Sequence, residues 1–197
     1  MAAGKVCTGF SKPYVALYSA SGGTVSYTSG QLLARGVSVS GSADQADDNN
    51  FYADNIVAET ESGVFTSGEL TLTVDGLFQD AEKLIMGLPT AGTDGFVGYD
   101  DDQAIPDVGI GFIVRYMSGG STTYTPVIFP RCAFRFPNVD ASTQEENIDW
   151  QTQELTALIK RAEDGKNTWK KVGGDLTTEA AAEDKIKTAF GISSTTT

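Results

Sequence analysis

The densest set of side chains that could bind an ion or take part in catalysis lies in the stretch DDNNFYADNIVAETESG, residues 47–63. Carboxylates and asparagine amides there surround Phe51, Tyr52 and Ile56. Such oxygens can bind Ca²⁺, and a pair of carboxylates can act as general acid and general base. A third interpretation is a polar strand whose partner lies on another molecule. The rest of the chain must decide among the three.

A calcium site is the first interpretation. Hard oxygen ligands occur in two acidic segments, residues 44–50 and 100–102. Neither segment has the D-x-[DN]-x-[DN]-G spacing and distal glutamate of a calcium loop. A solvated acidic loop explains both segments more simply, and we expect no metal and no cofactor.

Catalysis is the second interpretation. The chain contains no histidine, which excludes Ser-His-Asp and Cys-His triads and the usual zinc sites. A nucleophile elbow and a glycine-rich phosphate loop are both missing, and no pair of acids stands out as a glycosidase pair. Trp150 and Trp169 are the only tryptophans that could serve as sugar platforms. The sequence therefore predicts a protein that is not an enzyme.

The general composition predicts one folded unit. The 197 residues are 40% hydrophobic with 22 glycines, which favours a mainly β domain over residues 1–191. We expect an extended N-terminal segment, a polar loop at 41–50 and a disordered tail at 192–197. The sequence has no run of 18 apolar residues, so we expect no membrane span. The N-terminus lacks the apolar region of a secretory signal. Cys7 and Cys132 fit no metal spacing; a disulfide between them is not expected, and Cys132 reads as a buried small hydrophobe.

The charge distribution carries more information than the net charge of −12. Residues 41–110 hold fifteen acids and one base, whereas residues 1–40 hold three bases and no acid. A second basic segment, residues 159–172, holds five bases against two acids. One interpretation is an unevenly charged, solvated surface. The other is that the basic ends of one copy dock on the acidic middle of another, a heterologous contact that builds rings or filaments.

The basic segment also has a nucleic-acid interpretation, because Trp169 lies among its lysines and could stack on a base. The segment is short and the chain is strongly acidic, so protein–protein docking is favoured. The candidate interface residues, taken from both charged regions, are Asp44, Asp47, Asp48, Asp54, Asn55, Lys160, Arg161, Lys170 and Lys171.

Alternating apolar residues predict strands at 13–20, 33–40, 69–75, 108–117 and 122–136, with a hairpin turn at Gly22-Gly23. Pro126 and Pro130 predict that the last of these is an edge or bulged strand. Residues 51–59 are expected to form one strand, in which Asp54 and Asn55 suggest a bulge or an unusual environment.

Two helices are expected. The first, at about 77–87, has an apolar face of Phe78, Ala81, Ile85 and Leu88 and ends near Gly87. The second, at about 178–190, begins at Thr177 or Thr178, ends at Gly191 and has a thin apolar face of Ala182, Ile186, Ala189 and Phe190. Residues 145–163 are ambiguous: propensity slightly favours a helix, whereas the alternation of Ile148, Trp150 and Thr152 favours a strand.

Several short pieces together resemble the major tail proteins of phages, the tube-forming subunits of long non-contractile tails. They are the run NNFYADNIVAETESGVFTSGELTLTVDGLFQDAEKLIMGL, a YVALYS strand, the hairpin GIGFIVRYMSGGSTTYTPVIFP, and DWQTQELTALI ahead of DGKNTW. The resemblance covers most of the chain, from about Pro13 to Lys171, and includes no catalytic motif.

The resemblance implies a tail-tube-type β-sandwich or β-barrel with a flanking helix, and a strand at 148–159. It implies six-membered rings that stack into a tube, through which DNA passes to the host without specific binding. The chain would be made in the host cytoplasm and reside in the virion tail, with itself and the tape-measure, tail-terminator and tail-tip proteins as partners. The alternative function is an Ig-like surface or carbohydrate-binding module of a virion or bacterial surface.

Overall fold

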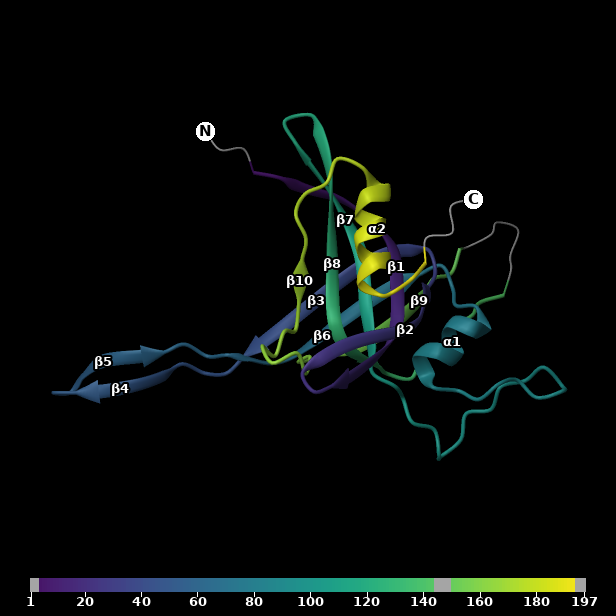
Figure 1. Ribbon diagram of the computed structural model, residues 1–197, viewed down its shortest axis with the longest axis horizontal. Coiled ribbons are helices and arrows are strands. Elements are labelled where there is room, and N and C mark those ends of the chain that lie inside the picture. Colours follow the sequence, from purple (N-terminus) through teal and green to yellow (C-terminus); the bar gives the residue numbers. More distant parts are fainter. Residues whose placement is uncertain (1–3, 144–149, 194–197) are drawn as a thin grey trace.

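The computed structural model describes residues 4–143 and 150–193 of the chain (Figure 1). Most of the described strands form one antiparallel sheet in the order β2-β1-β7-β8-β9-β6-β3, and β10 also pairs with β8. Its members are β1 (Val6–Ser21), β2 (Thr24–Leu32), β3 (Gly36–Gln45), β6 (Phe65–Val74), β7 (Val108–Ser118), β8 (Ser121–Phe134), β9 (Gln153–Lys160) and β10 (Lys171–Val172). The remaining elements are a separate hairpin of β4 (Asn49–Ala53) and β5 (Ile56–Glu61) and the helices α1 (Gln79–Met86) and α2 (Glu179–Ala189). The protein is mainly β, as predicted.

The main core lies between two halves of the curved sheet. Figure 1 shows β3 and β6 crossing β7 and β8 at a steep angle, as in a β-sandwich. Leu70, Leu72 and Val74 of β6 point into this core, as their alternation predicted, and Phe112 of β7 faces them from the other half. Helix α1 closes one end of the core with Ala81, Ile85 and Met86.

A second, smaller core lies on the outer face of β1 and β7, under α2. Ala182, Ile186 and Phe190 of the helix pack there with Ile113 of β7. The helix comes close because β7 presents glycines: a Cβ at Gly111 would lie 2.8 Å from Ile186 Cγ2, and one at Gly109 would lie 2.8 Å from Phe190 Cε1. The thin apolar face of α2 is therefore sufficient for a tight fit.

The helix ends follow local rules. The Thr178 side chain accepts a hydrogen bond from the Ala181 amide at 3.3 Å, which confirms the predicted start of α2. Gly87 has φ of 66°, and its left-handed conformation ends α1 where predicted. Two predicted face residues are wrong: Phe78 precedes α1 and is 83% exposed, and Ala189 of α2 is exposed.

The predicted polar loop at 41–50 is largely a strand. Residues 41–45 continue β3 and pair with β6, from Gly41 opposite Leu70 to Gln45 opposite Phe65. The polar side chains misled the prediction because β3 ends the strand order and its side chains there are exposed. Residues 49–50 belong to β4.

The proline-containing strand β8 lies inside the strand order rather than at its edge. It pairs with β7 along most of its length and with β9 through residues 131–134. The bulge is confirmed, since the β7–β8 register shifts between the pairs Val108–Cys132 and Ile110–Phe129, around Pro130. Cys132 is fully buried, and neither cysteine is in a disulfide.

Residues 153–160 form a strand, so the propensity-based preference for a helix was wrong. Leu155, Ala157 and Ile159 are buried at every second position, and β9 pairs with β6 on one side and β8 on the other. This packing outweighs the weak helical propensity of the segment. The beginning of the ambiguous segment 145–163, residues 145–149, and the end of the predicted tail, residues 194–197, lie outside the described residues.

Candidate assembly surfaces

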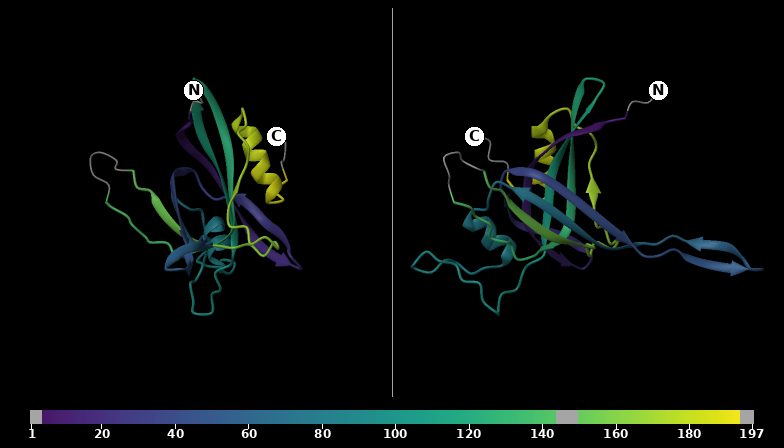
Figure 2. Two further views of the ribbon diagram at one scale, coloured as in Figure 1. Left: turned by 90° about the vertical axis from the view of Figure 1, so that its left-hand side faces the viewer. Right: turned by 180° about the vertical axis from the view of Figure 1, so that it is seen from behind.

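A long hairpin extends from the body between β3 and β6; we call residues 46–64, which contain β4 and β5, the arm (Figures 1 and 2). Its base is held by a hydrogen bond from the Ala46 amide to the Val64 carbonyl at 2.9 Å. At about 3.3 Å per residue, the nine positions from Ala46 to Asp54 reach roughly 30 Å. The tip therefore lies well away from the body, as both figures show.

The arm is a hairpin because Asp54 and Asn55 form its turn. They have φ of 51° and 65°, and Ala53 pairs with Ile56 across them. Positive φ at both central residues is the geometry of a two-residue type I′ turn, which aspartate and asparagine tolerate better than most residues. The predicted single strand at 51–59 is thus wrong: the two unfavourable strand residues reverse the chain instead of forming a bulge.

Large apolar side chains on the arm are exposed to solvent. Phe51, Tyr52 and Ile56 are 64%, 62% and 66% exposed, and Val57 is exposed too. Tyr52 pairs with Val57, while Phe51, the residue before Tyr52 in β4, faces the opposite side. Both faces are therefore apolar and uncovered. An isolated two-stranded hairpin is at best marginally stable in water, so the arm would gain from a partner.

The arm is also strongly acidic. It carries Asp47, Asp48, Asp54, Glu59 and Glu61 and no basic residue. Asp48 Oδ1 accepts a hydrogen bond from the Gly63 amide at 3.1 Å and so braces the base. Of the other predicted interface acids, Asp44 lies in β3 and accepts a bond from Ser67 at 3.0 Å. The predicted acids thus spread along the arm from root to tip.

The predicted basic residues do not form one cluster. Lys160 is bonded to Asp107 at 2.7 Å, and the Arg161 guanidinium donates to the Phe65 carbonyl. Lys170 lies over the Phe129 ring on the side of the main core. Lys171, the first residue of β10, borders a groove that Lys170 does not line.

Lys160 belongs to a structural ion network rather than to a free surface. Asp107 is bonded to Lys160 at 2.7 Å and to Arg131 at 2.6 Å, and Arg131 also pairs with Glu163 at 2.6 Å. Burial raises the pKa of Asp107, but the hydrogen bonds from Lys160 and Arg131 outweigh it and hold the pKa below its usual range. The network links Asp107, the residue before β7, to β8 and β9, which leaves Lys160 little freedom to bind a partner.

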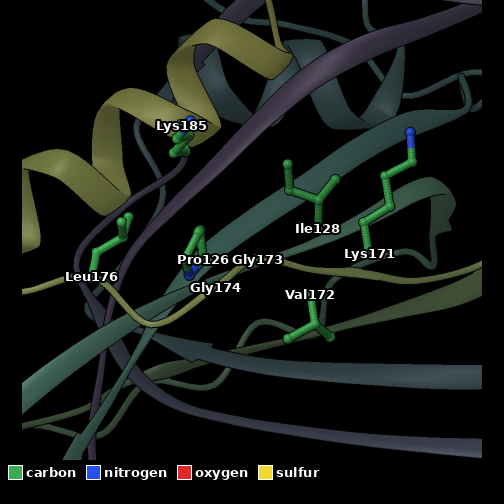
Figure 3. Close-up of a pocket in the computed structure, with 8 residues that line it drawn as sticks. All are labelled: Pro126, Ile128, Lys171, Val172, Gly173, Gly174, Leu176 and Lys185. Atoms are coloured by element: carbon green, nitrogen blue, oxygen red, sulfur yellow. The ribbon is translucent and has the colours of Figure 1, made fainter.

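A groove of about 290 Å³ lies between α2 and β10 (Figure 3). Its floor is mostly apolar, and Figure 3 shows Lys185 of α2 and Lys171 on either side of Pro126 and Ile128. Neither lysine side chain has a hydrogen bond or ion pair within the described part of the chain. We call this the α2 groove; its lining is Pro126, Ile128, Lys171, Val172, Gly173, Gly174, Leu176 and Lys185.

A second basic hollow lies beside the root of the arm. The Trp169 ring stacks on Phe65 with centroids 4.6 Å apart, and Arg161 and Lys166 line the same hollow. We call these residues, with Val64 and Asn167, the root patch. Trp169 is thus largely occupied by Phe65, which leaves less of its ring for stacking on a nucleic-acid base.

No family model and no curated protein matches the chain. Within residues 4–143 and 150–193, no three acidic, cysteine or histidine side chains gather as metal ligands would. The helices of the same residues are too short or too polar to span a bilayer.

The arm could have been found from sequence. Asp-Asn is a type I′ turn signal, and residues on both sides of it are apolar at matching positions. The α2 groove left no such signal, because its lining comes from β8, β10 and α2, which meet only through folding.

Proposed function

We propose that the protein is a structural subunit that assembles with copies of itself into the stacked rings of a phage tail tube. The observation that carries this proposal is the arm. Its exposed aromatic side chains and unbroken negative charge suit an interaction element whose partner surface lies on another molecule.

The open ends of the sheet support the same proposal. Among the described strands, β2 and β3 each have a neighbour on one side only. An unpaired edge is a template for pairing with another chain, which monomeric proteins usually blunt. Joining such edges between copies would extend the sheet around a ring.

A polar outer face suits a channel. On the side of β3, β6 and β9 away from the core, Ser40 lies opposite Thr71, which lies opposite Thr156. Ser38 also donates to Thr73 at 2.9 Å. A face of hydroxyl groups with few positive charges would remain hydrated and would not hold phosphates, so DNA could pass without adhering. We propose that this face lines the lumen.

In this function the chain has no catalytic role and needs no cofactor. It would lie in the virion tail, where its ring ends meet the tape-measure, tail-terminator and tail-tip proteins. Its principal partner is a second copy of itself.

Electron microscopy of the purified protein tests the proposal. We expect negatively stained rings or tubes at high protein concentration. The matched variant replaces residues 46–64 by Asn-Gly, which closes β3 onto β6 because Gln45 already pairs with Phe65. It should fold as a monomer and form no tubes. Tubes from the armless variant would contradict the role given to the arm, and a wild-type monomer that binds a glycan would contradict the proposed function.

A further inference from the structure

We propose that the α2 groove is the docking site for the arm of a second copy of the chain. This inference rests on the proposed function and adds to it the identity of the receiving surface. A tip carried roughly 30 Å from the body would then insert between α2 and β10 of its neighbour.

Charge is the first reason for choosing this occupant. Lys171 and Lys185 form no hydrogen bond or ion pair within the described residues, and none of the residues that line the α2 groove is acidic. Asp164 interacts with Lys171 electrostatically, without a direct ion pair. The arm has five carboxylates and no base. Opposite charges that form no ion pair within their own chain steer two surfaces together and fix their register.

Shape and polarity are the second reason. A volume of about 290 Å³ is at the small end of ligand sites, which run from roughly 300 to 1,000 Å³, and it suits one or two side chains of a protein partner. The floor offers Pro126, Ile128 and Leu176, and the arm offers exposed Phe51 and Ile56 on one face. Aromatic side chains that enter an apolar pocket ringed by polar groups are the usual anchors of protein interfaces.

The root patch is the rival surface, but it is less available. Its aromatic ring is stacked on Phe65, and Arg161 is bonded to the Phe65 carbonyl. Lys166 of the root patch, like the lysines of the α2 groove, forms no side-chain hydrogen bond or ion pair within the described residues, so the difference lies in Arg161 and Trp169.

The geometry determines the kind of assembly. The arm and the α2 groove lie at separate places on one chain, as Figure 1 shows for β4, β5 and β10. A contact between two different surfaces is heterologous, so each copy can give one arm and receive another. The contact therefore propagates from copy to copy, as a ring or a tube requires.

Charge reversal tests the site. The variant Lys171→Glu/Lys185→Glu should remain folded, since both side chains are exposed, and should lose polymerisation at least tenfold, measured as the rise in the critical concentration by sedimentation. The matched control, Arg161→Glu/Lys166→Glu, changes the net charge equally at the root patch and should polymerise much more nearly like the wild type. Loss of polymer in the control alone would overturn the assignment to the α2 groove.

Comparing the polymerisation of the armless chain with that of the Lys171→Glu/Lys185→Glu chain separates this inference from the proposed function. The armless chain keeps the α2 groove, and the Lys171→Glu/Lys185→Glu chain keeps the arm, so the two carry different defects. If the groove variant polymerises normally while the armless chain does not, the arm is needed but docks elsewhere, and this inference fails alone. If both polymerise, the role proposed for the arm fails as well.

Disulfide trapping gives a direct readout in the assembled protein. Ala53→Cys lies beside the turn, and Gly174→Cys has space, since a Cβ there meets nothing within 4 Å. Exposed Cys7 is replaced by serine in all variants. Oxidation of the double variant should give a ladder of dimers, trimers and larger species, whereas each single cysteine should give at most dimers. A double variant without a ladder in assembled tubes would contradict docking in the α2 groove.

Discussion

The small core under α2 and the arm place their apolar side chains in opposite environments. Under α2, Ile186 is fully buried against glycines of β7, whereas Phe51 and Ile56 of the arm are about two-thirds exposed. The first surface is completed within one chain; the second is not. The contrast indicates which part of the sequence serves the fold and which is available for assembly.

Polar contacts follow the same division. Glu183 of α2 binds Lys187 at 2.7 Å and Tyr14 at 2.6 Å and also pairs with Lys12. Lys12 has φ of 51° and lies where the β1–β7 register shifts between Ser11 and Tyr14, so a bulge aims it at the helix. Within the part of the chain that the structure describes, the arm has only local hydrogen bonds, such as that from Thr60 to Asn50 at 2.7 Å.

The largest effect is expected from Ile186→Ala. Truncating this fully buried isoleucine of α2 should lower the free energy of unfolding by about 2–5 kcal/mol, because the closely packed residues between α2 and β7 cannot collapse to fill the cavity. Urea denaturation of the monomer measures this change. The control is exposed Thr188→Ala on the same helix, expected to change stability by less than about 0.5 kcal/mol. A loss as small for Ile186→Ala as for the control would show that α2 is not part of the cooperative fold.

An intermediate, pH-dependent effect is expected from Glu183. Burial raises its pKa, but hydrogen bonds from Lys12, Lys187 and Tyr14 outweigh burial and hold the pKa at about 2 instead of 4.5. A lowered pKa in the folded state contributes stability above pH 4.5 that is lost as the pH falls towards 2.

The measurement is the difference in unfolding free energy between wild type and Glu183→Gln across that range. Glu179 and Asp184 are close by on α2 and are unchanged in both proteins, so their titration largely cancels in the difference. The wild-type advantage should be greatest near pH 5 and shrink as the solution is acidified. An advantage that does not vary between pH 5 and 2 would contradict the ion cluster.

The smallest effect on the fold is expected in the arm. Phe51→Ser/Tyr52→Ser should change monomer stability by less than about 0.5 kcal/mol per site, because both rings are already exposed. The same variant should fail to form tubes. Differential scanning calorimetry and negative-stain microscopy provide the two readouts. A loss of stability similar to that of Ile186→Ala would mean that the arm packs on its own body in solution, and the contrast would disappear.

Local sequence patterns were enough to predict those features of the fold that depend on neighbouring residues. Alternation in 69–75 predicted the buried face of β6, Gly22-Gly23 predicted the β1–β2 turn, and Thr178 and Gly87 predicted helix ends. Each depends on a few neighbouring residues, whose conformational preferences and hydrogen bonds act before any tertiary contact. The same holds for the turn at Asp54-Asn55, where the signal was present but was taken for a bulge.

Tertiary structure decided what depends on distant neighbours. Residues 153–160 are a strand because β6 and β8 pair on either side of them, and residues 41–45 are a strand because β6 lies beside them. The basic residues, close in sequence, were separated by the tertiary structure: Lys170 lies over the Phe129 ring beside the main core, whereas Lys171 borders the α2 groove. The sequence by itself determined a mainly β chain whose acidic middle carries a hairpin turn signal at Asp54-Asn55. Only the folded sheet decided that this hairpin extends away from the body and which lysines form no ion pair.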